Sequence, residues 1–321
     1  MREMNYCNLC PRSCGVDRTL GGTGFCGMSD QLKIARAALH YWEEPCISGT
    51  GPDGGRGPGS GTVFFSGCNL RCVYCQNHDI SSQGFGACID TGRLTEIFFE
   101  LKAQGAVNIN LVTPTHYIPP IVTALERARA AGLNLPIVWN TGGYESVEGL
   151  KMLEGLVDIY LPDFKYMDED RAELYSAARD YPAVAKAALG EMFRQVGEPV
   201  FDEAGLMKRG MIVRHLLLPG GRRDSMEVLR YLYETYGDGI YISIMSQYTP
   251  LPEVLNRSGG RVKFPELYRR VSPRSYDRLV EYALGLGITN AFIQEGDAAE
   301  ESFIPPFTLT GVLKKEESHE V

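Results

Sequence analysis

Short apolar runs alternate with amphipathic stretches along most of the chain. Several short runs are rich in Val, Ile, Leu and Phe, a composition typical of buried parallel strands. They fall at residues 62–65, 107–112, 135–139, 157–161, 211–218, 240–245 and 288–293. Between them apolar residues recur at helical spacing, which predicts helices near residues 94–101, 121–130, 147–153, 168–193, 226–236 and 276–286. Alternation of this kind predicts an α/β fold with a parallel sheet and helical crossovers.

The number of strand–helix units limits the architecture. Six to seven units are too few for a closed eight-fold barrel but fit an open, partial barrel, whose active site lies at the carboxyl ends of the strands. Residues 48–61 are rich in Gly, Pro and Ser and predict a linker. We therefore expect a Cys-rich N-terminal extension with a linker over 1–60, a core domain over 61–295 and a C-terminal tail over 296–321. Residues 32–41 fit a helix or a strand equally well.

Composition and charge narrow the function classes. The 321 residues carry a net charge of −8, which argues against a general nucleic-acid binder but leaves room for a small anion held by a few arginines. The N-terminus has no apolar signal-peptide region, and no apolar run approaches transmembrane length, so we expect a cytoplasmic protein without a membrane partner. Nine cysteines in a reducing compartment indicate metal or redox use rather than disulfides.

Three cysteines directly follow the first expected strand. Cys68, Cys72 and Cys75 have the spacing C-x3-C-x2-C. Each thiolate can bind one iron of a [4Fe–4S] cube, which leaves the fourth iron without a protein ligand and open for chemistry. The alternative is a zinc site with three cysteines and one histidine, in which His78 is the fourth ligand.

The cysteine spacing resembles the signature of the radical S-adenosylmethionine (radical SAM) enzymes, and Tyr74 matches the aromatic residue that this family has before the third cysteine. The resemblance implies a partial (β/α)6 TIM-like barrel in which S-adenosylmethionine chelates the open iron. It further implies that flavodoxin or ferredoxin reduces the cluster. The cofactor is then cleaved to methionine and a 5′-deoxyadenosyl radical, which abstracts hydrogen from a substrate.

Residues 61–294 are most similar to uncharacterised homologues of pyruvate formate-lyase activating enzyme. That similarity implies a glycine of a glycyl-radical enzyme as the hydrogen source. The expected strand ends add candidate residues. The family's Gly-Gly-Glu-like motif is absent after the second strand, where Thr113 or Thr115 would supply an oxygen acceptor instead. The neighbouring His116 is predicted to be a loop histidine rather than a catalyst.

Later strand ends resemble those of the activating enzymes. Asn140, Thr141 and Asp163, with Lys165 nearby, match sequences that surround a monovalent cation beside the cofactor carboxylate. Hard oxygen ligands suit such a cation. The resemblance further implies that Arg214 binds the cofactor carboxylate and that Gln247 lies near the adenosine. His215 is expected to face the opposite side of the strand from Arg214.

A second group of cysteines lies near the N-terminus, with the spacing C-x2-C-x3-C-x11-C: Cys7, Cys10, Cys14 and Cys26. It suits a four-ligand zinc site or a closed auxiliary iron–sulfur cluster, and the sequence does not choose between them or exclude a site without metal. Cys46 and Cys88 are predicted to be small buried apolar residues, with Cys46 as a further candidate to line the site.

Three functions remain open from the sequence. The first is a radical SAM enzyme that activates a protein. The second is a radical SAM enzyme that modifies another peptide or a small molecule. The third is a non-catalytic cysteine or zinc module. Formation of 5′-deoxyadenosine would exclude the third, and a glycyl-radical protein encoded nearby would favour the first.

Overall fold

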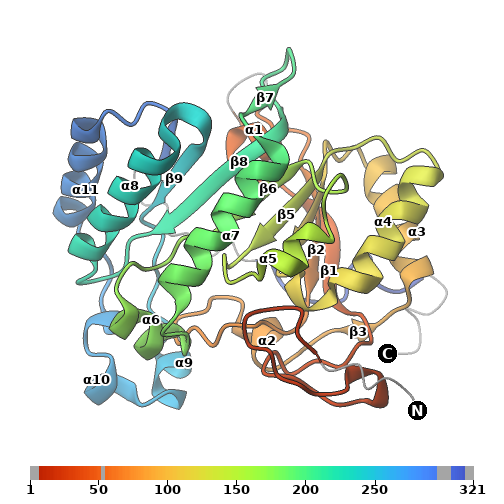
Figure 1. Ribbon diagram of the computed structural model, residues 1–321, viewed down its shortest axis with the longest axis horizontal. Helices are drawn as coiled ribbons and strands as arrows, with labels where there is room; N and C mark the ends of the chain where they lie inside the picture. The colour runs from red at the N-terminus through yellow and green to blue at the C-terminus, as the bar shows by residue number, and fades with distance from the viewer. Residues whose placement is uncertain (1–6, 52–54, 295–304, 315–321) are drawn as a thin grey trace.

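The computed structural model describes residues 7–51, 55–294 and 305–314. Its sheet has the order β10-β9-β8-β6-β5-β4-β2-β1-β3, with β7 paired to β8. The strands that pair in parallel follow one another in chain order: β2 (Ser60–Phe65), β4 (Ile109–Val112), β5 (Ile137–Thr141), β6 (Ile159–Pro162), β8 (Met207–Leu216), β9 (Tyr241–Met245) and β10 (Ala291–Ile293). Each overlaps an expected apolar run, so the prediction of an α/β fold with a parallel sheet and helical crossovers is confirmed (Figure 1).

Helices cover the outer face of this sheet (Figure 1). In α3 the buried residues Leu94, Ile97, Phe98 and Leu101 have the predicted helical spacing, and the side chain of Asp90 caps the N-terminus. The other long helices follow the predicted ranges: α3 (Thr91–Ala103), α4 (Ile118–Ala130), α7 (Tyr181–Val196), α8 (Arg222–Tyr236) and α11 (Pro273–Leu286). The short α5 (Val147–Lys151) follows β5.

The helical stretches expected over 168–193 are two helices. The first, α6 (Glu169–Ser176), begins at the capping side chain of Asp168 and ends at Ala177, whose φ is +52°. A left-handed residue at this position ends a helix. Pro182 then lies in the first turn of α7, where its fixed φ is favourable. The break places Ser176 at the end of a helix, directed toward the cysteine loop.

The undecided segment 32–41 forms a strand, β1 (Lys33–His40), which pairs antiparallel with β2. The short edge strand β3 (Ala87–Cys88) pairs with β1. Cys88 is exposed there, so its predicted burial is wrong, because the edge strand leaves that side chain uncovered. The remaining short elements are η1 (Arg18–Leu20), α2 (His78–Ser81), η2 (Thr115–Tyr117), β7 (Val200–Phe201) and η3 (Gly237–Gly239).

After β1 the chain enters the interior of the barrel. The short helix α1 (Pro45–Ser48) buries Cys46 and Ile47 in an apolar cluster with Val138, Leu161 and Ile212 from strands β5, β6 and β8. Cys46 is therefore a buried apolar residue, as predicted. This packing brings the two residues before α1, Glu43 and Glu44, beneath the cavity described below.

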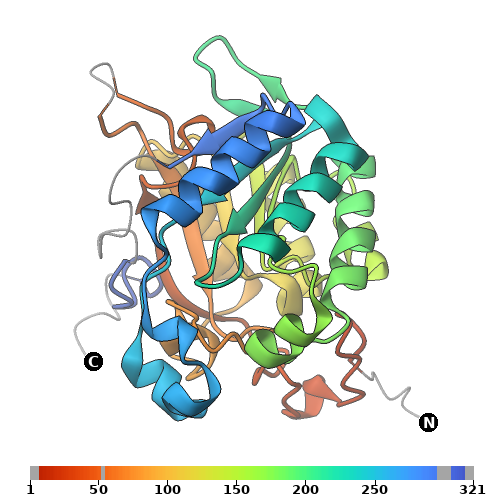
Figure 2. The same cartoon turned by 90° about the vertical axis from the view of Figure 1, so that its left-hand side faces the viewer.

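A small helical layer follows β9: α9 (Pro252–Arg257), α10 (Gly260–Lys263) and η4 (Glu266–Tyr268). It lies at the same end of the molecule as α2 and the N-terminal extension (Figures 1 and 2). Residues 305–314 return to the sheet, where Ala37 N–H donates to the carbonyl of Thr310. The rest of the predicted tail, 296–304 and 315–321, lies outside the described residues, and the domain limits at residues 60 and 295 stay predictions. None of the helices in the described ranges is long and apolar enough to cross a membrane.

Candidate active site

The cysteine loop begins where β2 ends. Gly67 has a φ of +88°, and a Cβ atom there would come within 2.3 Å of the Met28 side chain and 2.9 Å of the Cys26 carbonyl oxygen. Only glycine fits both the left-handed backbone and this close approach. The turn directs Cys68, Cys72 and Cys75 into a cavity of about 650 Å³.

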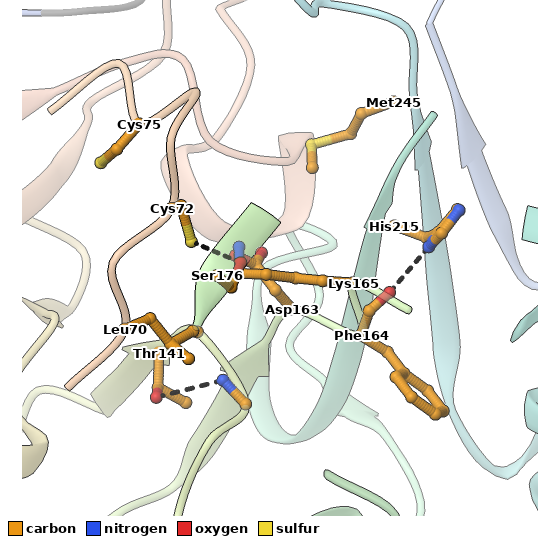
Figure 3. A network of polar contacts seen from close by, with 12 residues as sticks. Leu70, Cys72, Cys75, Thr141, Asp163, Phe164, Lys165, Ser176, His215 and Met245 are labelled. Atoms are coloured by element: carbon orange, nitrogen blue, oxygen red, sulfur yellow. Dashed lines mark hydrogen bonds and ion pairs between the residues drawn. The ribbon is translucent and has the colours of Figure 1, made fainter. Parts of the chain in front are cut away.

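Each cysteine of the loop has a hydrogen-bonding neighbour. The backbone N–H of Leu70 lies 3.4 Å from Cys68 Sγ, Ser176 Oγ lies 3.0 Å from Cys72 Sγ, and Ser81 Oγ lies 3.3 Å from Cys75 Sγ. Figure 3 shows the contact between Cys72 and Ser176. Burial raises the pKa of the Cys68 and Cys75 thiols, so binding of a metal centre must release their protons.

The donor set of the loop fits an iron–sulfur cluster. Thiolates are the usual ligands of such clusters, and each cysteine would bind a different iron. Within the described ranges, no three His, Cys, Asp or Glu side chains converge closely enough to hold one metal ion. A cube does not require that convergence. His78, the fourth ligand of the zinc alternative, instead lies 3.0 Å from Asp79 Oδ1 and 3.0 Å from Gln83 Nε2.

The predicted cofactor-binding residues come together in this one cavity. They come from the cysteine loop and from five strand ends, and all of them line the cavity: Tyr74, Thr113, Asn140, Thr141, Asp163, Lys165, Arg214 and Gln247. Parallel strands present their carboxyl ends on the same side, which explains this convergence. Their roles stay predictions.

Thr113 has a strained backbone. Its φ is +57°, a conformation that β-branched residues rarely adopt, and its N–H donates to the carbonyl of Asn140 at 2.8 Å. Strain of this kind is concentrated at functional sites, where the surrounding structure enforces it. It turns the chain after β4 so that Thr113 lines the cavity, whereas Thr115 does not. Of the two oxygen acceptors considered from the sequence, the structure leaves Thr113.

Replacing Thr113 with Gly is expected to stabilise the protein. Glycine adopts a positive φ without strain, which favours the folded state. The greater backbone entropy of glycine in the unfolded chain offsets part of this effect, so the expected net stabilisation is about 1 kcal/mol. Urea unfolding of Thr113→Gly beside the unchanged protein measures this gain. Lower stability in Thr113→Gly would show that the threonine side chain contributes more than its strain costs.

Asp163 and Lys165 form an ion pair, with Oδ2 and Nζ 2.5 Å apart (Figure 3). The two residues are two positions apart directly after β6, a spacing that places side chains of extended backbone on the same side. Burial disfavours the ammonium of Lys165, but the Asp163 carboxylate and the nearby Cys72 thiol outweigh it and hold its pKa above the usual value. The cavity wall therefore presents a fixed positive charge beside the cysteines.

Two carboxylates that the sequence did not predict hold Arg214. Its Nε donates to Glu44 Oε1 at 2.8 Å, and one terminal nitrogen donates to Glu44 Oε2 at 2.6 Å and also to Glu43. Burial alone would raise the pKa of Glu44, but the guanidinium holds it below the usual value. His215, on the same strand, lies outside the cavity, and its Nδ1 lies 2.7 Å from the carbonyl of Phe164 (Figure 3). It therefore faces the opposite side from Arg214, as expected.

Buried hydroxyl groups connect Tyr74 to the cysteines. The hydroxyls of Tyr74 and Tyr166 are 2.5 Å apart, Tyr166 lies 2.9 Å from Ser176 Oγ, and Ser176 contacts Cys72. The sequence indicated Tyr74 alone, because Tyr166 and Ser176 belong to a different strand–helix unit. The chain of hydrogen bonds fixes the orientation of the Ser176 hydroxyl toward the sulfur atom of Cys72.

Gln247 connects three segments around the cavity. Gln76, in the cysteine loop, donates to its carbonyl at 3.4 Å, and Gln294, after β10, donates to its Oε1 at 3.1 Å. Gln294 also accepts from the N–H of Ser246 at 2.9 Å. These bonds hold the ends of β9 and β10 against the cysteine loop.

Comparison with known proteins agrees with this geometry. Residues 62–209 match the model of the Radical SAM superfamily. That family implies a [4Fe–4S] cluster and S-adenosylmethionine as cofactors, and the three-thiol loop beside the cavity suits the cluster. Over 285 residues the chain is 27% identical to "Uncharacterized protein MJ0674" of Methanocaldococcus jannaschii, an alignment that covers 86% of this chain and 74% of that protein.

Solved structures give more distant matches. One is Streptococcus suis SuiB bound to precursor peptide SuiA, with 12% identity, a TM-score of 0.48, and coverage of 70% of this chain and 46% of that chain. Another is native anSMEcpe with bound AdoMet and Kp18Cys peptide, with 15% identity, a TM-score of 0.46, and coverage of 68% and 57%. The chain thus spans about half the length of these structures.

The Cys-rich N-terminal extension packs directly on the cysteine loop. Arg12 donates from Nε to the carbonyl of Asn69 at 2.8 Å, and Arg71 of the cysteine loop donates to the carbonyl of Phe25 at 2.5 Å. Burial raises the pKa of the Cys10 thiol to about 12, and Cys14 Sγ accepts from the N–H of Phe25 at 3.1 Å. The structure therefore supports an anchoring role for the extension, while a metal held by its four cysteines stays a prediction.

Replacing Cys10 with Ala is expected to leave the signal of the catalytic cluster intact. Arg12 and Arg71 donate hydrogen bonds that join the extension to the cysteine loop, and the Cys10 thiol adds one with the side chain of Asn69, which is not one of the three loop cysteines. The measurement is the electron paramagnetic resonance (EPR) signal of the reduced cluster and its response to S-adenosylmethionine. Loss of that signal in a folded Cys10→Ala protein would mean that the two cysteine groups do not act separately.

Glu145 is a second buried acid that the sequence did not indicate. It follows β5, is 2% exposed, and its Oε1 accepts from Thr115 at 2.6 Å and also from Thr141. Within the described residues its Oε2 has no hydrogen-bond partner. Burial raises the pKa of Glu145 to about 7, which the two threonine hydroxyls oppose. Thr141, a residue of the cavity lining, thus directs its hydroxyl to Glu145.

His116 is likewise structural. It is buried, its Nε2 lies 2.7 Å from the carbonyl of Ser66, and it lies outside the cavity lining. Burial lowers its pKa to about 4, so the imidazole is neutral near pH 7. This placement suits the loop histidine expected from the sequence.

Proposed function

We propose that this protein is an oxidoreductase of the radical SAM class. The observation that supports the proposal is the loop of Cys68, Cys72 and Cys75 at the carboxyl end of β2, beside a cavity lined by polar strand ends. When bound at these cysteines, a [4Fe–4S] cluster supplies the electron that cleaves S-adenosylmethionine to methionine and a 5′-deoxyadenosyl radical, which abstracts hydrogen from the substrate.

The protein's own residues would bind and orient the cofactor. Lys165 places a positive charge near the thiolates and favours their ionised form. The hydrogen bonds of Arg214 to described residues use Nε and one terminal nitrogen, so its other terminal nitrogen is left for the cofactor carboxylate. Thr113 and Asn140 offer oxygen atoms at the ends of neighbouring strands, and Gln247, after β9, lines the same cavity as the residue expected near the adenosine.

The polar groups of the cavity alternate with apolar ones. Phe64, Val112, Leu216 and Met245 line it together with the residues above. Such a lining excludes water from the reacting groups and strengthens the electrostatic interactions among them. A monovalent cation near Asn140, Thr141 and Asp163 is part of the proposal, but Asp163 is already paired with Lys165, so such an ion would have to compete with that ammonium.

Two classes of substrate are proposed. The resemblance to pyruvate formate-lyase activating enzymes supports a glycine Cα of a glycyl-radical enzyme, presented by a loop that enters the cavity, with flavodoxin or ferredoxin as the reductant. The cavity volume of about 650 Å³ is within the range of small-molecule sites, which supports a peptide or small molecule as the second candidate. A zinc ion or closed cluster at the N-terminal cysteines and a cytoplasmic location belong to the same proposal.

The test is an anaerobic reconstitution. The protein is loaded with iron and sulfide, reduced with dithionite and mixed with S-adenosylmethionine, and 5′-deoxyadenosine is quantified. Formation that depends on iron and sulfide supports the radical SAM function. Absence of 5′-deoxyadenosine, with zinc bound at Cys68, Cys72 and Cys75, would instead favour the non-catalytic metal module.

A further inference from the structure

One segment of the chain has a charge opposite to that of the whole. Residues 257–278 contain two acidic and seven basic side chains, a formal charge of +5 in a chain whose total is −8. All seven basic residues are exposed: Arg257, Arg261, Lys263, Arg269, Arg270, Arg274 and Arg278. None of them forms an ion pair with another residue of the described ranges. Of the two acids, Glu266 accepts a hydrogen bond from the hydroxyl of Tyr175. We call residues 257–278 the basic segment.

The basic segment adjoins the cysteine loop. Arg257 Nη1 lies 3.3 Å from His78 Nε2, three residues after Cys75. Beneath the charged surface the ring of Phe264 packs against Tyr175 at 6.1 Å. Figure 2 shows this helical layer at the end of the molecule where the loop lies. A protein bound to the basic segment would therefore lie next to the wall that carries the cysteines.

An exposed apolar side chain lies between the charges. Val262 is 98% exposed, between Arg261 and Lys263 on α10. The side chains of Arg261 and Lys263 lie over the rings of Tyr268 and Phe264, at 4.9 and 5.2 Å from the ring centres. These contacts fix the two cations near Val262. An apolar residue within a charged rim is a common arrangement in transient protein–protein interfaces.

The charge of the basic segment and its position beside the cysteine loop together indicate what kind of protein binds there. The proposed reaction consumes an electron that must come from outside the chain, and the electron must reach the cysteine loop. Complementary charge steers a partner to a surface and accelerates association, more than it tightens the final complex. A basic surface on an acidic protein selects for a strongly acidic partner and orients it with respect to the loop.

We propose that the basic segment is the docking surface for a small acidic electron-transfer protein, which delivers its electron at the side of the cysteine loop near His78. This inference rests on the proposed function, because it assigns the electron to the cluster held by that loop. To that function it adds the surface on which the electron-transfer protein binds and the basic residues that determine the rate of association.

The test compares two charge-reversal proteins of equal charge. Arg261→Glu with Lys263→Glu alters the basic segment. Arg127→Glu with Arg209→Glu makes the same change on α4 and on β8, away from the loop, where both arginines are exposed. The probe is a bacterial flavodoxin in its hydroquinone form, mixed with each reconstituted protein. Stopped-flow absorbance of the flavin gives the rate of electron transfer.

The basic-segment variant is expected to accept electrons about tenfold more slowly than the unchanged protein at low ionic strength. The difference should disappear at high ionic strength, because salt screens exposed charges. The control variant should match the unchanged protein. Dithionite, a small reductant that needs no docking surface, should reduce all three proteins at the same rate.

Equal flavodoxin rates in the two variants would overturn the docking proposal and leave the proposed function untouched. Failure of dithionite to reduce any of the proteins would overturn the proposed function. In that case direct binding of oxidised flavodoxin, measured by calorimetry, still decides the docking proposal, because complex formation needs no electron transfer. Binding of a single-stranded oligonucleotide that the basic segment controls, without flavodoxin binding, would assign the surface to nucleic acid and overturn the proposal.

Discussion

Replacing Cys72 with Ala is expected to abolish cleavage of S-adenosylmethionine, with 5′-deoxyadenosine no higher than in a protein-free control. The sulfur of Cys72 lies in the site, with Ser176 Oγ 3.0 Å away and Lys165 nearby. Without it the loop offers two thiolates, which cannot hold a cube with one open iron. Iron content and the cluster absorption band should fall together with the activity.

The matched control for that variant is Cys88→Ala. Cys88 is exposed on the two-residue edge strand β3 and lies outside the cavity, so its loss should change neither iron content nor product. Circular dichroism and thermal unfolding establish that both variants are folded. Retained cleavage in a folded Cys72→Ala protein would refute the assignment of the cluster to this loop, and loss of activity in both variants would indicate a general effect of cysteine removal.

The sheet could be predicted from the sequence for a clear physical reason. Strands β4, β5 and β6 are covered on both faces, so each is a nearly continuous apolar run. Because the carboxyl ends of parallel strands meet on one side, the same pattern predicted which end of the sheet carries the site, whereas Thr113 and Arg214 were singled out by the family resemblance. The local pattern left residues 32–41 undecided between helix and strand, and they form β1 because that segment pairs with β2.

The missed site residues come from long-range packing. Glu43 and Glu44 lie in a turn before a four-residue helix, and only the packing of α1 inside the barrel brings them to Arg214. Ser176 lies 104 positions from Cys72 and is placed by the helix break at Ala177. One feature of the sequence indicated that Arg214 would have acidic partners. An arginine within an apolar strand requires a buried partner, and the two adjacent acids in the extension were candidates.

Replacing Glu145 with Gln is expected to remove a pH-dependent loss of stability. The folded pKa of Glu145 is about 7, against an ordinary value of 4.5, mainly because burial disfavours the carboxylate. Below pH 4.5 the group is protonated in both the folded and unfolded states and costs nothing. As the pH rises to 7, the unfolded chain loses this proton and the folded protein keeps it, so stability falls. Above pH 7 the full cost of about 3 kcal/mol is present.

The measurement is the free energy of unfolding in urea across this pH range, for the unchanged protein and for Glu145→Gln. Other titrating groups are common to both proteins, so the difference between the two curves isolates Glu145. The glutamine can still accept from Thr115 and Thr141 through its amide oxygen, at a cost of about 1 kcal/mol for the buried amide nitrogen. The Gln protein should therefore be the less stable at low pH and the more stable at high pH.

Glu148→Gln is the control, because Glu148 is exposed on α5, three residues further along the chain. Its curve should follow that of the unchanged protein. Parallel curves for the unchanged protein and Glu145→Gln would mean that Glu145 ionises normally and that water or a cation reaches its Oε2. The expected crossing would instead establish that an uncharged carboxyl group holds Thr115 and Thr141 in place behind the cavity at pH values below 7. The acid is then a structural element whose stabilising contribution the protein loses as the pH rises.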